Sequence, residues 1–547
     1  MKSFYSLFIA LLLCSASFLS FGQAPKIQWT KCFGGSLDES IYDVQQTVDG
    51  GYIMVGFSYS NDGVVTGHFG PAGAFTDLLV IKTDALGNII WTHSFGGSDN
   101  DGAYSVQQTR DGGYIIAGYT YSSDGDVTGH YSSLFQDVWI LKLDAHGHAV
   151  WQKCLGGSDN DFAKSIHQTT DGGYIFAGAT TSNDGNVTNL HKDAMGYYTE
   201  DMWVVKLDDT GAVQWQKTLG GGANEEANSV KQTKDGGYIV AGFTSSADGD
   251  VAKHYGGKDD RDAWAVKLSS SGIIEWSKTF GGTQGDEFSS VIQDIDNSYV
   301  FTGYTTSNDY DVTDNHLNAG LSTQDLWIVK LTPYGSIEWQ KCFGGSAMET
   351  GSEIRQDSDS GYVIAGFTNS DDGDVSGFHP SPSYLYDAWV LRLDAKRNMT
   401  WQRCIGGSLG DLAYAVKLTK DGGCIIGGVS ASSDGDITGT TYGNGDFWLT
   451  KLAGPLTGID VITTNVKGIS IYPNPMSGWT AIHFDINTTQ KTSVEITDVC
   501  GKNLLDMSSS PDKNELIINT STWQPGVYFY KVLQNGNTLQ TGKLLKQ

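Results

Sequence analysis

The sequence predicts an all-β fold, a propeller of seven four-stranded antiparallel blades, from three observations. The first is a repeat in which a tryptophan recurs every 60 to 64 residues. The second is the presence of four strand signals in each repeat unit. The third is that the two ends of the repeat region hold complementary fractions of one unit. The tryptophans that mark the units are Trp29, Trp91, Trp151, Trp215, Trp276, Trp339 and Trp401.

The unit that follows Trp91 illustrates the four strands. The segment SVQQT at 105–109 is followed by a glycine-rich turn and by YIIAG at 114–118, a pattern typical of a hairpin. The segment DVWILKLD at 137–144 then leads through a short turn into a fourth strand that ends at Trp151. Strands that are apolar on both faces need cover on two sides, and radial stacking of the blades provides it.

The ends of the repeat region predict how the ring closes. The seventh unit reaches DFWLTKL at 446–452 and then breaks at Gly454 and Pro455, so it lacks a fourth strand. Segment 26–33, KIQWTKCF, has the pattern of a fourth strand with no third strand before it. We therefore expect the N-terminal strand to complete the last blade, because this pairing removes an open sheet edge.

Large side chains and cysteines also repeat with the blades. We interpret both tryptophan ladders as packing between blades, with stacking on a ligand as the alternative. The cysteines share a position that elsewhere holds serine or threonine, which favours free buried thiols over disulfides. The second ladder is Trp139, Trp203, Trp264, Trp327, Trp389 and Trp448, with Leu79 in the first unit, and the cysteines are Cys32, Cys154, Cys342 and Cys404.

Residues 1–22 are predicted to be a secretory signal peptide, because Lys2 precedes an apolar run and small residues end the segment. Lipidation at Cys14 is the alternative, although Leu13 stands where a small residue is expected. No later stretch has the roughly 20 apolar residues that span a bilayer, so we expect no transmembrane segment in the mature chain. The formal net charge of −27 argues against nucleic acid as a partner.

A different all-β pattern follows the predicted propeller of residues 23–453 and a linker at 454–468. The segments YPNP at 472–475, ITDVCGK at 496–502, PGVY at 525–528 and KLLKQ at 543–547 occur in this order. Together they resemble the type A C-terminal sorting domain of type IX secretion (Por) substrates from Bacteroidota.

The resemblance implies that residues 469–547 form a small immunoglobulin-like β-sandwich that the type IX translocon and its sortase recognise. It implies that the protein crosses the periplasm and ends outside the cell or on the outer-membrane surface, either released or anchored. An ordinary immunoglobulin-like binding module is the alternative.

The long loops are the candidate binding face of the propeller. If the strands run outward from the axis in chain order, the Gly-Gly loops and the long SxDGDVxG loops share one face, and the DGG turns lie on the other. The aspartates of the long loops are weak candidates for calcium binding, and the alternative is that they only build turns. One histidine per loop is too sparse for a shared transition-metal site. The calcium candidates are Asp124, Asp126, Asp248, Asp250, Asp372, Asp374, Asp434 and Asp436.

The favoured function is non-catalytic binding of glycans or proteins by the loop face, for adhesion, nutrient capture or an envelope role. Loop aromatics beside carboxylates suit sugar rings and protein surfaces alike. We assign no catalytic residue and no cofactor other than calcium, because no blade-specific pair of carboxylates is evident. Glu225 and Glu226 are interpreted as a solvated loop. The alternative function is a secreted polysaccharide-active enzyme, a glycoside hydrolase or lyase.

Overall fold

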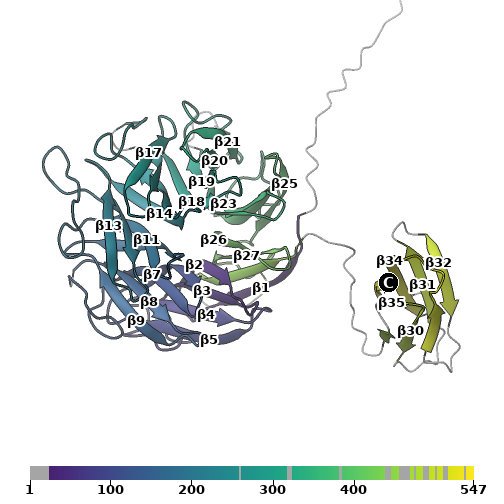
Figure 1. The fold of residues 1–547 in the computed structure, drawn as a ribbon. Helices are drawn as coiled ribbons and strands as arrows, with labels where there is room; N and C mark the ends of the chain where they lie inside the picture. The colour runs from purple at the N-terminus through teal and green to yellow at the C-terminus, as the bar shows by residue number, and fades with distance from the viewer. Residues whose placement is uncertain are drawn as a thin grey trace, which may run out of the picture. The chain divides into compact units, whose positions relative to one another are not determined.

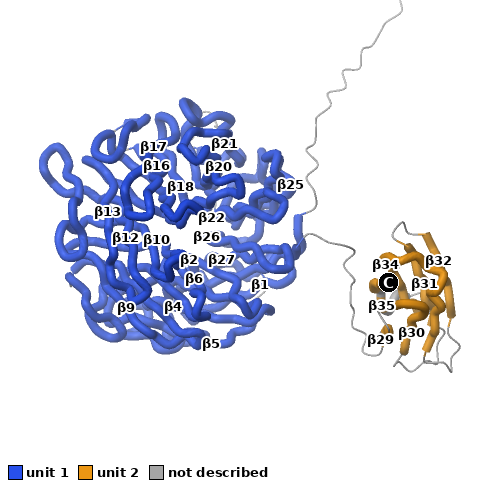
Figure 2. Tube along the Cα trace, viewed as in Figure 1, with its two compact units in different colours: residues 1–454 blue, residues 455–547 orange. Residues whose placement is uncertain are grey.

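The computed structural model describes two compact units, residues 1–454 and residues 455–547 (Figure 2). The predicted signal peptide and the linker from residue 455 onward lie outside the described residues. These are 24–132, 134–257, 260–316, 323–380, 385–437, 445–454, 469–472, 476–484, 492–498, 502–508, 515–534 and 537–546.

Seven four-stranded antiparallel sheets make up the described part of the first unit, and Figure 1 shows them as blades around a central axis. In six blades the strands pair in chain order, which confirms the predicted propeller. Blades one to three contain β2 (Glu39–Gln46), β3 (Tyr52–Ser58), β4 (Asp77–Thr83), β5 (Ile89–Phe95), β6 (Asp101–Gln108), β7 (Tyr114–Thr120), β8 (Asp137–Leu143), β9 (Ala149–Leu155), β10 (Asp161–Gln168), β11 (Tyr174–Thr180), β12 (Asp201–Leu207) and β13 (Val213–Leu219).

The remaining blades follow the same plan, with the innermost strand first along the chain. Blades four to six contain β14 (Glu225–Gln232), β15 (Tyr238–Thr244), β16 (Asp262–Leu268), β17 (Ile274–Phe280), β18 (Asp286–Gln293), β19 (Tyr299–Thr305), β20 (Asp325–Leu331), β21 (Ile337–Phe343), β22 (Glu349–Gln356), β23 (Tyr362–Thr368), β24 (Asp387–Leu393) and β25 (Met399–Ile405). Blade seven contains β26 (Asp411–Leu418), β27 (Cys424–Ser430), β28 (Asp446–Leu452) and β1 (Ile27–Phe33).

The N-terminal strand closes the ring as predicted. Strand β1 pairs antiparallel with β28, and the seventh sheet has the order β1-β28-β27-β26. In Figure 1 the purple β1 lies beside the green strands of this blade. Thr30 and Thr450 face each other in the register, with 3.0 Å between their hydroxyl oxygens. The ends of the ring are therefore joined by a β ladder rather than by a covalent link.

The core of the propeller lies between neighbouring blades. Ile115 and Ile140 of blade two pack with Phe176 and Trp203 of blade three in one buried cluster. All six tryptophans of the second ladder are at most 1% exposed. Those of the first ladder are half-buried, and Trp29 packs at 5.8 Å edge-on to Tyr52 of the next blade. Both ladders therefore serve packing between blades.

The four repeated cysteines are free thiols in the described structure, as is Cys424. Cys154, Cys342 and Cys404 are buried and Cys32 is half-buried, and burial raises the pKa of Cys154 to about 12. A thiol with such a pKa stays protonated and unreactive at neutral pH. The interchange of cysteine with serine and threonine at this position therefore predicted its role correctly.

Each innermost strand contains one β-bulge, and the bulge determines which side chains of the strand point toward the axis. In β6 the register shifts between Ala103 and Ser105, so Tyr104 is the extra residue. A bulge reverses the face on which the following side chains lie. As a result Val106 packs between blades, whereas Ser105 and Gln107 turn toward the axis.

The second unit is a small β domain of two sheets, within its described residues. Its sheets have the orders β29-β30-β33 and β32-β31-β34-β35, and Ile482, Ile518, Val494 and Val532 share one buried core. Among the described residues of the whole chain, no helix has the length and apolar character needed to cross a membrane. The strands are β29 (Ile469–Tyr472), β30 (Trp479–Phe484), β31 (Thr492–Asp498), β32 (Asn503–Ser508), β33 (Glu515–Asn519), β34 (Gly526–Gln534) and β35 (Asn537–Lys546).

Candidate functional site

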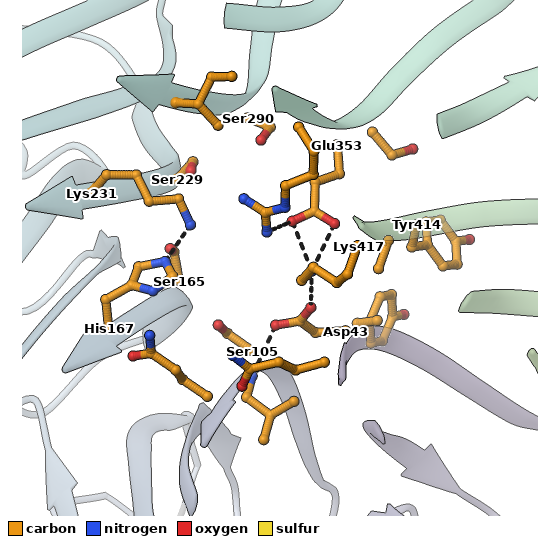
Figure 3. A pocket seen from close by; sticks show the side chains of 18 of the residues that line it. Asp43, Ser105, Ser165, His167, Ser229, Lys231, Ser290, Glu353, Tyr414 and Lys417 are labelled. Carbon is orange, nitrogen blue, oxygen red and sulfur yellow. Dashed lines mark hydrogen bonds and ion pairs between the residues drawn. The ribbon is translucent and has the colours of Figure 1, made fainter. Parts of the chain in front are cut away.

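A cavity of 920 Å³ lies at the axis of the propeller and is lined by the innermost strands of all seven blades (Figure 3). Its lining extends to Lys234 and Lys420, which stand beside DGG turns. The cavity therefore lies toward the face of the short turns. The candidate site that the sequence predicts, among the long loops, lies on the opposite face.

In the described structure, one ring of cavity side chains accepts hydrogen bonds from the backbone of the following blade in blades one, two, three and six. The hydroxyl of Ser105 accepts a hydrogen bond from the backbone N–H of Ile166 in the following blade, and Ser165 accepts one from Val230, both at 3.2 Å. Asp43 and Glu353 occupy the same position in blades one and six. Glu353 accepts the N–H of Val416 at 2.7 Å. These two carboxylates therefore replace hydroxyls in a structural role and add charge to the cavity.

A second ring, two residues further along each innermost strand, breaks the symmetry of the repeat. In the first two blades glutamines stand there, and Gln45 accepts the backbone N–H of Gln108 at 2.5 Å. In the other blades the residues differ in charge, size and polarity. The seven residues of this ring are Gln45, Gln107, His167, Lys231, Ile292, Arg355 and Lys417.

One side of the cavity holds an ion-pair network. Lys417 lies 2.7 Å from Asp43 and 2.7 Å from Glu353, which Arg355 also contacts. Burial opposes ionisation of Glu353, but Arg355 and Lys417 outweigh it and lower the pKa of this carboxyl. The expectation that the chain has no blade-specific pair of carboxylates is therefore wrong. The sequence does not reveal the pair of Asp43 and Glu353, because these residues stand 310 positions apart and come together only when the ring closes.

The other side of the cavity is basic. Lys231 donates to Nε2 of His167, and within the described residues it forms no ion pair with a carboxylate. Burial, Arg355 and Lys417 lower the pKa of Lys231 to about 7. Burial and Lys231 hold the pKa of His167 well below its usual value, so the imidazole is neutral at neutral pH and can accept this hydrogen bond. His167 is only half-buried by area, because it lines an open cavity.

The interpretation of Glu225 as part of a solvated loop is wrong. Glu225 is 0% exposed and begins strand β14. Its carboxylate accepts the backbone N–H of Gly221 at 2.9 Å and the hydroxyl of Thr244 at 2.7 Å, so the Gly-Gly loop folds over it. Glu226 turns to the other face, as the alternation of a strand requires, and pairs with Lys164. A buried Asp or Glu starts the innermost strand of every blade: Glu39, Asp101, Asp161, Glu225, Asp286, Glu349 and Asp411.

The repeated histidines of the long loops each stand near a buried aspartate in their own blade. Nδ1 of His191 lies 2.6 Å from Asp201, and Nδ1 of His316 lies 2.6 Å from Asp325. These hydrogen bonds raise the pKa of both histidines. His191 and His316 thus stabilise carboxylates of their own blades, whereas burial lowers the pKa of His68 and His130. Within the described residues, no group of three or more histidine, cysteine or acidic side chains has the arrangement of a metal site.

The calcium candidates take part in hydrogen bonds and ion pairs of the loops. The first aspartate of each pair accepts a backbone N–H from a Gly-Gly loop, as Asp124 does from Ser98 and Asp248 from Gly222, both at 2.7 Å. Asp372 and Asp434 repeat this contact at 2.7 Å. The second aspartates have varied partners, which are Gly96 for Asp126, His191 for Asp250, His316 for Asp374 and Arg403 for Asp436.

Calcium binding and turn building are the two interpretations of these aspartates, and thermal unfolding distinguishes them. We expect the melting midpoint to be the same in EGTA and in saturating calcium, because each first aspartate already satisfies a backbone donor. A midpoint that rises with calcium in the native protein, but not after Asp248→Asn with Asp250→Asn, would establish the calcium alternative.

One comparison with known proteins assigns a family to the C-terminal unit, and other comparisons find relatives that cover about two thirds of the chain. Residues 470–547 match the family model described as a secretion system C-terminal sorting domain. The regulatory protein FlaEY of Caulobacter vibrioides is 24% identical over 396 residues, which cover 68% of this chain and 38% of that protein. An uncharacterized WD repeat-containing protein, L264 of Acanthamoeba polyphaga mimivirus, is 20% identical over 453 residues, 65% of this chain and 32% of that one. The chain thus spans well under half of either relative.

Solved structures of propeller type are also similar to this chain. The WD40 domain of Neurospora crassa Pan2 aligns with 76% of this chain and 91% of that one, at 7% identity and a TM-score of 0.40. YCF48 bound to D1 peptide aligns with 80% of this chain and 100% of that one, at 10% identity and a TM-score of 0.39.

The seven closed blades and the matched C-terminal domain define an exported β-propeller protein. Its C-terminal domain is a type IX sorting domain, which is handled by the type IX secretion machinery. The protein is therefore extracellular or attached to the cell surface.

Proposed function

We propose that this exported propeller binds a glycan or a protein on its long-loop face, without chemical turnover. The observation that supports the proposal most strongly is Tyr310. It replaces, in blade five, a glycine of the long loop that every other unit retains. The six retained glycines are Gly63, Gly125, Gly185, Gly249, Gly373 and Gly435.

Tyr310 occupies a conformation that disfavours a side chain. Its φ is +51°, and the glycines of the other units have φ between +62° and +66°. At Gly125 an added Cβ would lie 2.3 Å from the carbonyl oxygen of Gly96, so blade five must adjust its backbone to hold a tyrosine. Positive φ at a bulky residue costs about 1 kcal/mol or more, and such strain gathers at functional sites. Tyr310 therefore fits a recognition role better than a packing role.

The surroundings of Tyr310 suit a sugar or a protein side chain. Tyr310 is 66% exposed, and the centre of its ring lies 5.1 Å from the centre of the ring of Tyr255, a loop aromatic of blade four. The ammonium group of Lys253 lies 3.5 Å from the centre of the Tyr255 ring. A cavity of 370 Å³ beside them is lined by Tyr255, Lys253 and Asp311, among others. Aromatic faces, a carboxylate and an amine can together stack on a ring and hydrogen-bond to its hydroxyls.

Substitution of Tyr310 by glycine tests this site, because we expect it to raise the stability of the propeller and to lower its affinity for the ligand. We expect Tyr310→Gly to stabilise the propeller by about 1 kcal/mol, because it relieves the strained conformation. We also expect it to weaken binding to a glycan-array or surface-protein ligand about tenfold, because an exposed aromatic anchor is lost. Thermal unfolding measures the first effect, and titration of the ligand measures the second.

Tyr334→Ala is the matched control for Tyr310→Gly. Tyr334 is 80% exposed and stands on a short turn of the opposite face. Its replacement should leave both quantities unchanged. Unaltered ligand affinity in Tyr310→Gly would refute the role of this loop site.

A polysaccharide-active enzyme is the second candidate, because Asp43 and Glu353 share the axial cavity. The contacts disfavour it, since both oxygens of Glu353 accept hydrogen bonds from Lys417 and its lowered pKa makes it a poor proton donor. The release of reducing ends from bound polysaccharides distinguishes the two. Turnover that disappears in Glu353→Gln would establish the enzyme.

A further inference from the structure

We infer that the basic side of the axial cavity binds the oxyanion of a small polar ligand, a carboxylate, sulfate or phosphate group held between Lys231 and the neighbouring serine hydroxyls. This site lies on the short-turn side of the propeller. It goes beyond the proposed binding by the long loops and does not depend on it.

The charge of the cavity is opposite to that of the chain. The chain carries a formal net charge of −27, yet the cavity lining holds three times as many basic as acidic residues. Like charges gathered in a partly desolvated cavity repel one another, and an anion that enters relieves the repulsion. The basic residues are Lys164, Lys231, Lys234, Arg355, Lys417 and Lys420, and the acidic residues are Asp43 and Glu353.

Lys231 differs from the other basic residues of the cavity in its partners. Lys164 pairs with Glu226, and both Lys417 and Arg355 pair with Glu353. Lys234 and Lys420 donate to backbone carbonyls near the turns. Within the described residues Lys231 contacts the neutral imidazole of His167 and has no carboxylate at ion-pair distance, so its charge, when present, has no direct counterion. A bound oxyanion would supply one.

The serine ring provides further donors beside Lys231. Figure 3 shows Ser165 and Ser229 on the same side of the cavity as Lys231, with Glu353 and Lys417 across from it and Ser290 between the two sides. The oxygen of Ser165 accepts the backbone N–H of Val230, which leaves its hydroxyl proton to be donated to a ligand. An oxyanion takes several such donors at once. The volume of 920 Å³ has room for a sugar-sized molecule that carries the anion.

The ionisation of Lys231 makes the site sensitive to pH. Its amine contacts His167, and burial together with the charges of Arg355, Lys417, Glu353 and Asp43 brings its pKa to about 7. An anion stabilises the protonated form and therefore raises this pKa. Affinity should consequently fall as pH rises above 7, and binding at alkaline pH should take up a proton.

Calorimetric titration of the purified protein with sodium sulfate and with D-glucuronate tests the inference, with D-glucose as the neutral comparison. At about pH 6 we expect both anions to bind more tightly than glucose, and their affinity to fall about tenfold by about pH 8.5. Binding of glucuronate but not sulfate would identify the anion as part of a sugar acid. Binding of both would indicate that the anionic group alone suffices.

Two variants of Lys231 separate its charge from its packing. Lys231→Gln introduces the residue that Gln45 and Gln107 supply at this position, so the blade should tolerate it, and anion affinity should fall about tenfold or more. Lys231→Arg should keep the affinity at about pH 6 and lose the decline toward alkaline pH, because arginine stays protonated. Lys396→Gln, at an exposed surface lysine, should have no effect.

The inference fails if neither anion binds more tightly than glucose, or if Lys231→Gln binds them as well as the native protein does, which would indicate an adventitious surface ion only. Ligand binding that depends on Tyr310 would survive either result. Conversely, anion binding that depends on Lys231 would stand even if no ligand of the long loops were found.

Discussion

Deletion of residues 26–33 is expected to lower the free energy of unfolding of the propeller by at least about 5 kcal/mol. The deletion removes the whole of β1, including Phe33, which is only 4% exposed, and leaves the edge of β28 unpaired. Loss of one large buried aromatic alone costs about 3–5 kcal/mol, and the lost ladder hydrogen bonds add to it. Denaturant unfolding followed by tryptophan fluorescence measures the change.

A synthetic peptide of residues 26–33 provides the control for this deletion. If β1 acts as a missing strand, the peptide should bind the open edge of β28 and restore part of the lost stability. Deletion of residues 24–25 alone should have little effect, because they precede the strand. A truncated protein that unfolds with native stability and cooperativity would contradict the closure of the ring by β1.

Closure and blade packing were predictable because they depend on what repeats. The pattern around Trp29 matches the fourth strand of every other unit, and the unit after Trp401 lacks that strand, so the pairing follows from the sequence. The second ladder was predictable for the same reason. A side chain that must fill the same space in each blade keeps its identity, and Leu79 shows the one exception.

The axial cavity was not predicted, because it depends on what does not repeat. Lys231 and Arg355 occupy a repeat position at which the first two blades carry glutamine and the residue varies elsewhere, and a search for the common pattern discards such differences. The bulge near Ser105 also breaks the alternation that would have assigned these residues to the axis. A comparison of the seven units position by position could have found the residues, but their meeting at one cavity requires the closed ring.

Glu225 illustrates a different limit. Its neighbours in the sequence, glycines and an asparagine, are typical of a solvated loop. The structure buries it because the Gly-Gly loop turns the backbone N–H of Gly221 inward, toward the acid. The burial of Glu225 could have been predicted from the equivalent position in other blades. Asp101 and Asp161 stand there, and both are fully buried.

Trp264→Ala is expected to destabilise the propeller by about 3–5 kcal/mol, the range for a fully buried tryptophan. Trp264 is 0% exposed and packs in the cluster between blades three and four, where Val204 and Val240 contact the same core. Its indole N–H donates to the hydroxyl of Ser277 at 3.0 Å. The substitution therefore leaves a cavity and removes this hydrogen bond, while the Ser277 hydroxyl keeps its hydrogen bond to the carbonyl of Asp250. Denaturant unfolding measures the loss.

Two further variants separate packing from other roles of this tryptophan. Trp264→Leu should cost less than Trp264→Ala, because blade one accommodates Leu79 at the same position with 0% exposure. Trp276→Ala, in the half-buried first ladder, should cost less than Trp264→Ala as well, because less area returns to water. If Trp264→Ala left stability unchanged but weakened binding of a ligand, the ladder would serve recognition. Its complete burial between two sheets argues that stability alone will change.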